Sequence, residues 1–251
     1  MTINSVSFLR ALHWLNAGWH YFSANIGAWF AMSLLFFISI AILIMIPAIG
    51  IFIMVLLLPI FFAGLLYAAD RSEHGTSPQV EYIAFGFGLQ PPRLNLFLLG
   101  TLMLLYFLLL ILALSPFSSA IFQSLYPIYN TGSYTTPEIS LLTQGFLHQH
   151  PLILWAQLLI LIGGFAAFAH AVPLTLFEGV NPLKAVQLSL QGFIHNLLPV
   201  SILLALSLLL AALATFAFGI GFLILLPVLV GANYASYRDI FIAETEELAT
   251  A

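Results

Sequence analysis

Residues 49–69 read IGIFIMVLLLPIFFAGLLYAA and are followed at once by Asp70 and Arg71. A hydrocarbon core of about 30 Å needs roughly 20 helical residues to cross it. This stretch is long enough and holds no charged residue, so it predicts a membrane-spanning helix. Comparable stretches recur along the chain and predict six spans, at about 28–46, 49–69, 94–114, 152–177, 197–217 and 220–237.

The composition fits an integral membrane protein and excludes several other classes. Hydrophobic residues make up 62% of the 251 residues and charged residues 6%, whereas a soluble domain carries about 25% charged residues. The absence of cysteine removes disulfides, thiolate metal sites and cysteine nucleophiles. Five Lys and Arg residues and a formal net charge of −4 leave no basic face for nucleic acid. We therefore expect membrane lipids as partners and no nucleic acid.

The positions of the basic residues predict the orientation of the chain. When the chain is threaded through the six spans, every Lys and Arg falls on one side of the membrane: Arg10, Arg71, Arg93, Lys184 and Arg238. Cytoplasmic loops carry an excess of Lys and Arg, so both termini should be cytoplasmic. The predicted fold class is an all-α membrane protein with a single integral membrane domain, residues 1–251. Its six transmembrane helices form three hairpins, and 115–151 is the non-cytoplasmic loop.

Each hairpin is preceded by a cytoplasmic segment that is too polar to cross. In 5–23 the apolar residues recur at helical spacing: Phe8, Leu12, Leu15, Trp19 and Phe22. In 182–195 they are Leu183, Val186, Leu190 and Ile194. Both patterns are typical of an amphipathic helix in the membrane interface, and cytosolic caps packed over the bundle are the alternative. The segment 80–90 is less regular, because Gly86 and Gly88 weaken a helix there.

The second and sixth spans share a pattern that suggests an internal repeat. Each has a proline in mid-span, then Gly-x-x-Tyr-Ala, then a charged pair: Pro59, Gly64, Tyr67 and Asp70–Arg71, against Pro227, Gly231, Tyr234 and Arg238–Asp239. A mid-span proline kinks a helix and frees a carbonyl, and a glycine lets a neighbouring helix approach closely. Helix packing accounts for the pattern. Two broken helices flanking a substrate path are the functional alternative.

Ionisable groups inside a membrane are costly and are the first place to look for function. No Asp, Glu, Lys or Arg falls in the central part of any predicted span, which argues against an ion-driven transporter. His170 and Asn233 are the main polar residues that remain. Pro173 follows His170, so the imidazole is either neutral and bonded to a carbonyl freed by that proline, or part of a proton or ligand site.

A weak metal-site candidate lies at the non-cytoplasmic mouth of the fourth span. His148 and His150 could bind a metal from an extended segment, with Glu138 as a third ligand. Zinc and copper sites need three or four ligands of defined geometry, and this spacing is unspecific. We therefore expect no metal and no other cofactor.

The C-terminal stretch Leu226–Phe241, LPVLVGANYASYRDIF, resembles the closing motif of the BPSS family of bacterial membrane proteins, known by a locus tag. Pro182, Ala185 and Ser189 are similar to that family's entry to its last hairpin, small–Pro–x–x–Ala–hydrophobic–x–x–Ser. The resemblance covers most of the chain and is strongest in about its last sixty residues. It implies a multi-pass protein of the bacterial inner, cytoplasmic membrane, and it brings no established activity with it.

The chain carries no nucleophile–base pair, phosphate-binding glycine loop or paired carboxylates, so we expect that it is not an enzyme. The leading hypothesis is a multi-pass inner-membrane protein that acts as a subunit, scaffold or envelope-maintenance factor through helix packing. Its partner would be a second copy or another membrane protein. The alternative is a carrier or channel for a lipid or a small apolar molecule, and a membrane-embedded enzyme is the third hypothesis.

Overall fold

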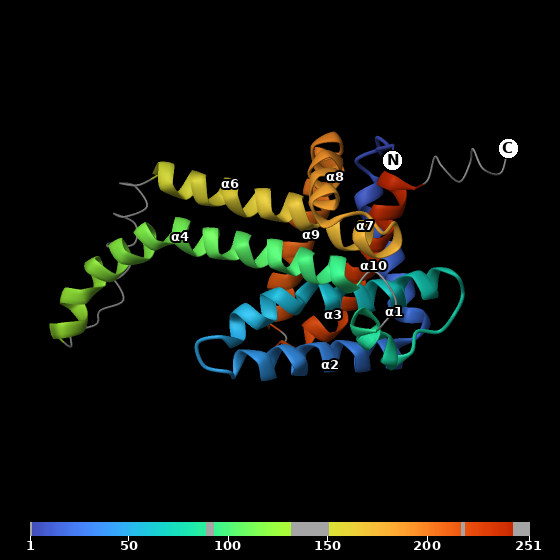
Figure 1. Cartoon of the computed structure of the whole chain (residues 1–251), viewed down its shortest axis with the longest axis horizontal. Coiled ribbons are helices and arrows are strands. Elements are labelled where there is room, and N and C mark those ends of the chain that lie inside the picture. The colour runs from blue at the N-terminus through green and yellow to red at the C-terminus, as the bar shows by residue number, and fades with distance from the viewer. Residues whose placement is uncertain (1, 89–92, 132–150, 217–218, 243–251) are drawn as a thin grey trace. The chain divides into compact units, whose positions relative to one another are not determined.

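The computed structural model describes residues 2–88, 93–131, 151–216 and 219–242, and every regular element in them is helical (Figure 1). The elements are α1 (Arg10–Ala24), α2 (Ile26–Ile44), α3 (Gly50–Glu73), the 3-10 helix η1 (Val80–Phe87), α4 (Arg93–Thr131), α6 (Pro151–Phe168), α7 (Ala171–Phe177), α8 (Pro182–His195), α9 (Leu197–Phe216) and α10 (Gly221–Phe241).

The chain divides into two compact units. The main unit comprises Met1–Met103 and Ala166–Ala251, and the second unit comprises Leu104–Phe165. In the second unit the hydroxyl of Tyr106 donates to the carbonyl of Ile160, which ties α4 to α6. All residues discussed below as candidate sites belong to the main unit.

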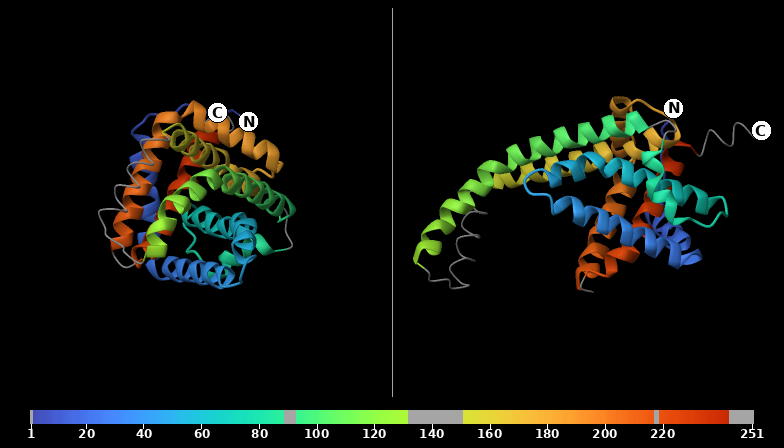
Figure 2. Two further views of the ribbon diagram at one scale, coloured as in Figure 1. Left: turned by 90° about the vertical axis from the view of Figure 1, so that its left-hand side faces the viewer. Right: turned by 60° about the horizontal axis from the view of Figure 1, so that its bottom comes forward.

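The hydrophobic stretches form helices close to the predicted bounds in four cases. The helices α2, α3, α9 and α10 correspond to the first, second, fifth and sixth predicted spans. Ala48 forms the tight turn between α2 and α3, with a φ of 64°. Gly50 then lies against the carbonyl of Leu43, where a side chain would not fit. Figure 2 shows α2 running into α3 as such a hairpin.

Two predicted spans differ from the helices found. The third predicted span ends at Leu114, but α4 continues to Thr131, so part of the predicted outer loop 115–151 is helical. Pro116 follows Ser115, but a proline removes one helical hydrogen bond without necessarily ending the helix. The fourth predicted span, 152–177, is divided into α6 and α7 by a break at Ala169 and His170. Residues 132–150, which include His148 and His150, lie outside the described part of the chain.

Among the described residues, five helical stretches are long and apolar enough to cross a membrane. They are Ile26–Ile44, Gly50–Glu73, Arg93–Ser115, Trp155–Phe177 and Leu197–Phe216. The chain is therefore a multi-pass membrane protein. The helix α10 is 21 residues long but is not among the five, because its second half holds Asn233, Arg238 and Asp239.

The helix α10 lies at the centre of the main unit, where it contacts α1, α2, α3, α7 and α9. Its burial explains how it accommodates polar residues, since protein rather than lipid surrounds them. Tyr234, Tyr237 and Phe241 are among the largest fully buried side chains of the described residues. By contrast, α2 and α9 leave most of their long hydrophobic faces exposed. The polar core of the main unit therefore lies around α10.

The three surface segments that precede the hairpins adopt short helices. The segment 80–90 forms the 3-10 helix η1, which packs against α3, with Gly86 close to the backbone of Ile60. The helix α8 packs against α7, and α1 packs along α10. Thus η1 and α8 each pack against the helix that precedes them in the chain, whereas α1 packs against the last helix, α10.

Candidate functional site

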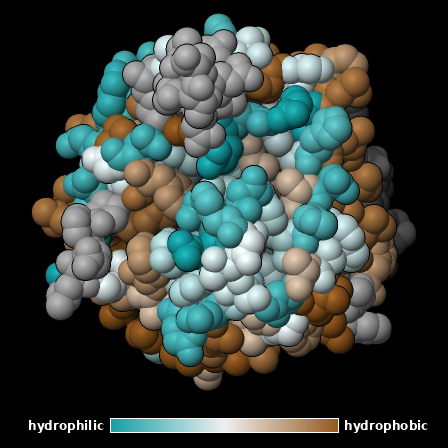
Figure 3. Space-filling view, turned by 90° about the vertical axis from the view of Figure 1, so that its right-hand side faces the viewer, coloured by the Kyte–Doolittle hydropathy of each residue, from teal (hydrophilic) through white to brown (hydrophobic). Residues whose placement is uncertain are grey.

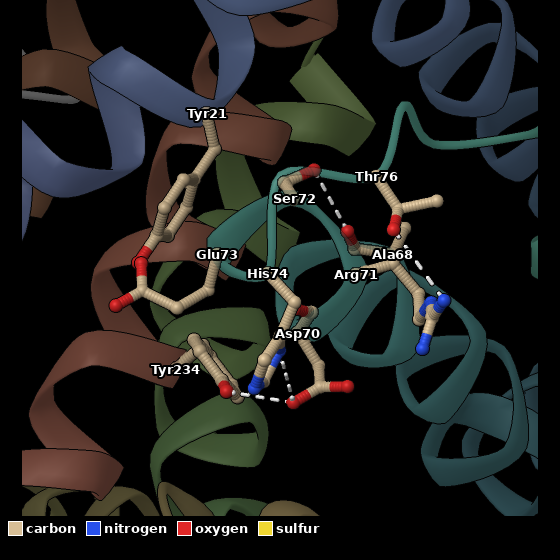
Figure 4. A network of polar contacts seen from close by, with 9 residues as sticks. All are labelled: Tyr21, Ala68, Asp70, Arg71, Ser72, Glu73, His74, Thr76 and Tyr234. Atoms are coloured by element: carbon tan, nitrogen blue, oxygen red, sulfur yellow. Dashed lines mark hydrogen bonds and ion pairs between the residues drawn. The ribbon is translucent and has the colours of Figure 1, made fainter.

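Carboxylates gather where α3, α7 and α10 end, and we call Asp70, Glu73, Glu178 and Asp239 the carboxylate cluster. Each accepts a hydrogen bond from an aromatic side chain of another element. The hydroxyl of Tyr234 donates to Asp70 at 2.8 Å, and that of Tyr237 donates to Glu178 at 2.7 Å. Figure 4 shows the part of the cluster at the end of α3, with Tyr21 of α1 donating to Glu73.

The fourth carboxylate joins the first and last helices of the described chain. Arg10 donates to both oxygens of Asp239, at 2.8 and 2.6 Å, and Trp14 Nε1 donates to the same group at 2.6 Å. The two planar groups form a bidentate pair, the strongest common arrangement for these residues. The Asp239 side chain is 17% exposed, so the pair is only partly screened by water. Asn4 and the backbone of Ile240 extend this junction, with N–H to O at 2.8 Å.

Burial and neighbouring charge set the ionisation of this region. Burial, followed by the hydrogen bond to Glu73, raises the pKa of Tyr21 well above its ordinary value, so its hydroxyl stays a donor. The hydrogen bond that Arg10 donates to Asp239 raises the pKa of Arg10, so that residue stays cationic. Arg238 also belongs here, because its guanidinium hydrogen-bonds Tyr234. The acids of the cluster are therefore held by hydrogen bonds from tyrosine and tryptophan side chains and by the cationic Arg10.

The chemistry available to the carboxylate cluster is mainly structural. Three of its acids accept a hydrogen bond from a tyrosine hydroxyl, and each bond links side chains of different helices or helix ends. The rings of the donors also pack together, since Phe177 stacks on Tyr237 and meets Tyr234 edge-on, both at 5.7 Å between centroids. The cluster fixes the ends of α3, α7 and α10 to one another and to α1.

A second polar group surrounds the break between α6 and α7, and we call His170, Ser189, Asn233 and Ser236 the helix-break cluster. Pro173 has no N–H to offer the carbonyl of Ala169. Asn233 Nδ2 donates to that carbonyl instead, at 2.8 Å. Ser189 of α8 makes two hydrogen bonds at the same break: its hydroxyl donates to the carbonyl of Ala166 at 2.7 Å and accepts from the N–H of His170 at 3.1 Å.

The imidazole of His170 is buried and bonded to Ser236, with 2.9 Å between Nε2 and Oγ. The Ser236 hydroxyl has one proton and lies 2.9 Å from the carbonyl of Asn233, to which it donates. It must then accept from His170, which places the proton of a neutral imidazole on Nε2. The remaining nitrogen, Nδ1, is a buried acceptor with no partner in the described structure, and so is Oδ1 of Asn233.

The structure places the residues singled out from the sequence in three surroundings: close contacts between helices, the carboxylate cluster and the helix-break cluster. Gly64 lies against the backbone of η1, with the Ile83 carbonyl 2.6 Å from where a Cβ would stand, and Gly231 is as close to Gly18 of α1. Tyr67 stacks on Phe85 at 3.9 Å between centroids. Pro59 and Pro227 are buried within helices that continue through them.

Tyr234, Arg238 and Asp239 fall in or beside the carboxylate cluster. His170 and Asn233 meet in the helix-break cluster, and Pro173 lies in the first turn of α7, the helix that follows the break. The carbonyl freed by Pro173 is taken by Asn233 and not by the imidazole.

Several residues of the two clusters were not singled out in the sequence. They are Asn4, Trp14, Tyr21, Glu73 and Ser236, which bond partners far along the chain or in other helices. One signal was available, because Trp14, Gly18 and Tyr21 recur at helical spacing on a face of their own.

Within the described residues, no group of three or more His, Asp and Glu side chains is placed to hold a metal ion. The predicted candidates His148 and His150 lie outside those residues. No family model, curated protein or solved structure matches this chain.

Proposed function

We propose that this chain is a multi-pass protein of the bacterial inner membrane, without a catalytic site, that acts as a subunit or scaffold through helix packing. The observation that carries the proposal is the contrast between its polar and apolar surfaces. The acids of the carboxylate cluster accept hydrogen bonds from other side chains of the protein. By contrast, α2 and α9 have long apolar faces that the rest of the main unit does not cover. Leu208, Leu209 and Leu213 of α9 are 57–63% exposed.

The proposed topology has six spans with both termini in the cytoplasm. Asn4 N–H donates to the carbonyl of Ile240 at 2.8 Å, so the two ends of the described chain are adjacent. Ends that share one side require an even number of crossings. Five helices meet the length and hydropathy needed, so α10 is the sixth crossing and is sheltered from lipid by its neighbours. The five basic residues then face the cytoplasm.

The proposal includes an internal repeat that relates α1–α2–α3 to α8–α9–α10. In each repeat one asparagine, Asn25 or Asn196, joins a surface helix to a long apolar helix, and its backbone angles are non-helical. When residues are counted back from these asparagines, the buried positions of the first repeat coincide with those of the second: Trp14, Gly18, Tyr21 and Phe22 against Ala185, Ser189, Gly192 and Phe193. Membership of the BPSS family is part of the same proposal, supported by Pro182, Ala185 and Ser189, which lie on the buried face of α8.

Cross-linking in native membranes tests the scaffold proposal, because the chain has no cysteine of its own. The variants Leu209→Cys and Leu213→Cys would carry a photoactivatable cross-linker on the exposed face of α9. We expect one discrete adduct, either with a second copy or with one companion protein. Ser207→Cys, on a more buried face of α9, is the matched control. Adducts with lipid alone at both exposed positions would overturn the proposal.

A carrier or channel for a lipid or small apolar molecule is the second candidate, favoured by the helix-break cluster. Broken helices with unpaired polar atoms at membrane depth often mark a substrate path. Here the break leaves His170 Nδ1 and Asn233 Oδ1 unpaired. Lipid exchange or uptake in liposomes would be measured with His170→Ala and Asn233→Ala, and with Ser207→Ala as the control. Flux that is unchanged in both variants would remove these residues from a path.

A further inference from the structure

The helix-break cluster is left with more hydrogen-bond acceptors than donors. The hydroxyls of Ser189 and Ser236 donate to carbonyls, and Nε2 of His170 donates to Ser236. Asn233 Nδ2 donates one of its two protons to Ala169. The acceptors that remain are Nδ1 of His170 and Oδ1 of Asn233, which are both buried and have no partner among the described residues.

The two acceptors belong to one small region of the main unit. Ala169 and His170 are consecutive, and they bond Asn233 and Ser236, which lie one turn apart on α10. His170 is 1% exposed, and its ring centroid lies 5.6 Å from that of Phe241. An unpaired acceptor in such a place is costly. A molecule that donates to these atoms would therefore be bound favourably.

The packing of α10 does not itself require polar residues at these positions. When α3 and α10 are aligned at their shared Gly-x-x-Tyr-Ala pattern, Leu66 and Ala69 of α3 stand at the positions of Asn233 and Ser236. Both residues of α3 are 0% exposed, so apolar side chains also pack at these two places. The bond to Ala169 accounts for the amide nitrogen of Asn233, but not for its oxygen.

The chemistry of the two acceptors selects a neutral hydroxyl. A phosphate, a carboxylate or a carbonyl would bring further oxygen acceptors and no proton. The helix-break cluster contains no acid, so a cationic amine would be buried without a countercharge. A hydroxyl donates its proton to an acceptor such as Nδ1 of His170, and its oxygen accepts from an N–H such as the second one of Asn233. Water and alcohols share this chemistry.

The cluster lies close to the end of α10. Ser236 precedes the last residue of α10, Phe241, by five residues, which is about 7.5 Å along a helix axis. Figure 3 shows the side of the molecule on which α1 lies in Figure 1, and α1 packs along α10 as far as Asp239. This side is hydrophilic near its centre and hydrophobic at several places around the edge. Water and membrane lipid are therefore the two sources of a hydroxyl to be distinguished.

We propose that the helix break is a binding site for a neutral hydroxyl, which donates to Nδ1 of His170, with Oδ1 of Asn233 as the second acceptor. The inference rests on the same site as the carrier or channel hypothesis and deepens it, because it names the molecules that the site accepts: water or alcohols, and not anions or cationic amines. It does not depend on the scaffold proposal. An ordered water or a ligand hydroxyl would complete the hydrogen bonds of a broken helix within the membrane.

Solid-state NMR of protein with ¹⁵N-labelled histidine tests the inference in bilayers of phosphatidylcholine, a lipid without a hydroxyl. Alanine labelled with ¹³C at the carbonyl identifies His170 without any substitution, because Ala169–His170 is the only Ala–His pair in the chain. We expect Nδ1 to have the chemical shift of a hydrogen-bonded acceptor and to receive magnetisation from hydroxyl protons. The shift of a free acceptor without such transfer, or a proton on Nδ1, would overturn the inference.

Addition of dioctanoylglycerol distinguishes the two sources of the hydroxyl. If the site holds water only, magnetisation transfer from water to Nδ1 is unchanged by this lipid. If the site takes an alcohol, the lipid reduces that transfer and shifts the Nδ1 signal. Either outcome supports the inference. The matched control is the acetylated analogue, which lacks the hydroxyl and should leave the signal unchanged. An equal response to both lipids would overturn the inference, because it would show recognition of the apolar body instead of the hydroxyl.

The liposome assay of the carrier or channel hypothesis is a separate readout. A hydroxyl bound at Nδ1, together with flux that is unchanged in His170→Ala and Asn233→Ala, would support this site and remove the carrier. A free Nδ1, together with flux that is altered in both variants, would support the carrier and overturn the hydroxyl site. The two proposals therefore fail on different measurements.

Discussion

Arg10 donates two hydrogen bonds to the carboxylate of Asp239, which lies 229 positions further along the chain. The pair joins α1, the first helix, to the last turn of α10. It lies beside the bond from Asn4 to Ile240, so the two ends of the described chain form one junction. This junction gives the proposed topology its even number of crossings.

The pair should show measurable coupling in the purified protein. We expect a double-mutant cycle with Arg10→Gln and Asp239→Asn to give a coupling free energy of about 1 kcal/mol, because the Arg10 side chain is 45% exposed and partly screened. Thermal unfolding in mild detergent measures it. The pair Lys184→Gln and Asp239→Asn, which has no contact in common, serves as the control and should be additive. A coupling of zero for the first pair would contradict the junction.

The topology predicts which residues share an aqueous phase. In intact bacteria, single cysteines at Ser7, Thr76 and Asn181 should react only with a membrane-permeant reagent, and one at Ala48 should react with an impermeant one. Ser7, Thr76 and Asn181 lie in the connections beside the ends of α1, α3 and α8, and Ala48 forms the turn between α2 and α3. Reaction of Thr76 and Asn181 from opposite sides would contradict the six-span arrangement.

The helices that face lipid were predicted more closely from the sequence than the contacts between them. Length and hydropathy placed α2 and α9 within a few residues, since the bilayer thickness fixes both quantities. The length of α4 was not predicted, because Ser115 and the proline after it resemble a helix end but do not form one here. Pro173 indicated a break in the helix before α7. The break lies at Ala169 and His170 because the proline has no N–H to donate to the carbonyl four residues earlier, that of Ala169.

The polar clusters were predicted only in part, for a physical reason. Periodicity reports which residues share a face of one helix, but not which helix covers that face. Asp70, Tyr234 and Asp239 stood out as parts of a repeated motif, but the pattern did not predict that Tyr234 donates to Asp70. Arg10, the partner of Asp239, was recognised only as one of the basic residues that share one side of the membrane. The close contacts of the two glycines in this motif, Gly64 and Gly231, were predicted correctly from the sequence. Two helices can approach closely only where a side chain is missing, and this requirement is the same for any neighbouring helix.

Glycine at position 231 should be required for the contact between α1 and α10. A Cβ there would stand 2.6 Å from Cα of Gly18, and backbone cannot yield as a flexible side chain does. We expect Gly231→Ala to destabilise the protein by about 1–3 kcal/mol through overpacking. Gly27→Ala is the matched control, because nothing lies within 4 Å of its added methyl group and alanine favours a helix. Equal melting temperatures for the two variants would contradict this close approach.

The tyrosines of α10 should stabilise the helix ends through their hydroxyls. Tyr234→Phe removes the donor to Asp70, whose side chain is 23% exposed, and should cost about 1 kcal/mol. Tyr67→Phe is the control, because its hydroxyl has no hydrogen-bond partner recorded among the described residues while its ring stacks on Phe85. The two variants separate the bond from the ring, since both keep the aromatic packing. A larger loss for Tyr67→Phe would contradict a stabilising role for the cluster.

His170 should be a neutral imidazole with its proton on Nε2. The Ser236 hydroxyl donates its proton to the carbonyl of Asn233. The hydrogen bond between Ser236 and His170 must therefore be donated by Nε2 of the histidine. Selective ¹⁵N labelling of histidine distinguishes the two tautomers by the chemical shifts of the ring nitrogens. We expect Ser236→Ala to shift the His170 signals and to cost about 1–3 kcal/mol, because it leaves buried polar groups unpaired. Ser207→Ala removes a hydroxyl that bonds only its own helix and should leave those signals in place. A proton on Nδ1 would mean that Ser236 donates to His170 instead, and the unpaired acceptor that His170 offers at the helix break would then be lost as a candidate site.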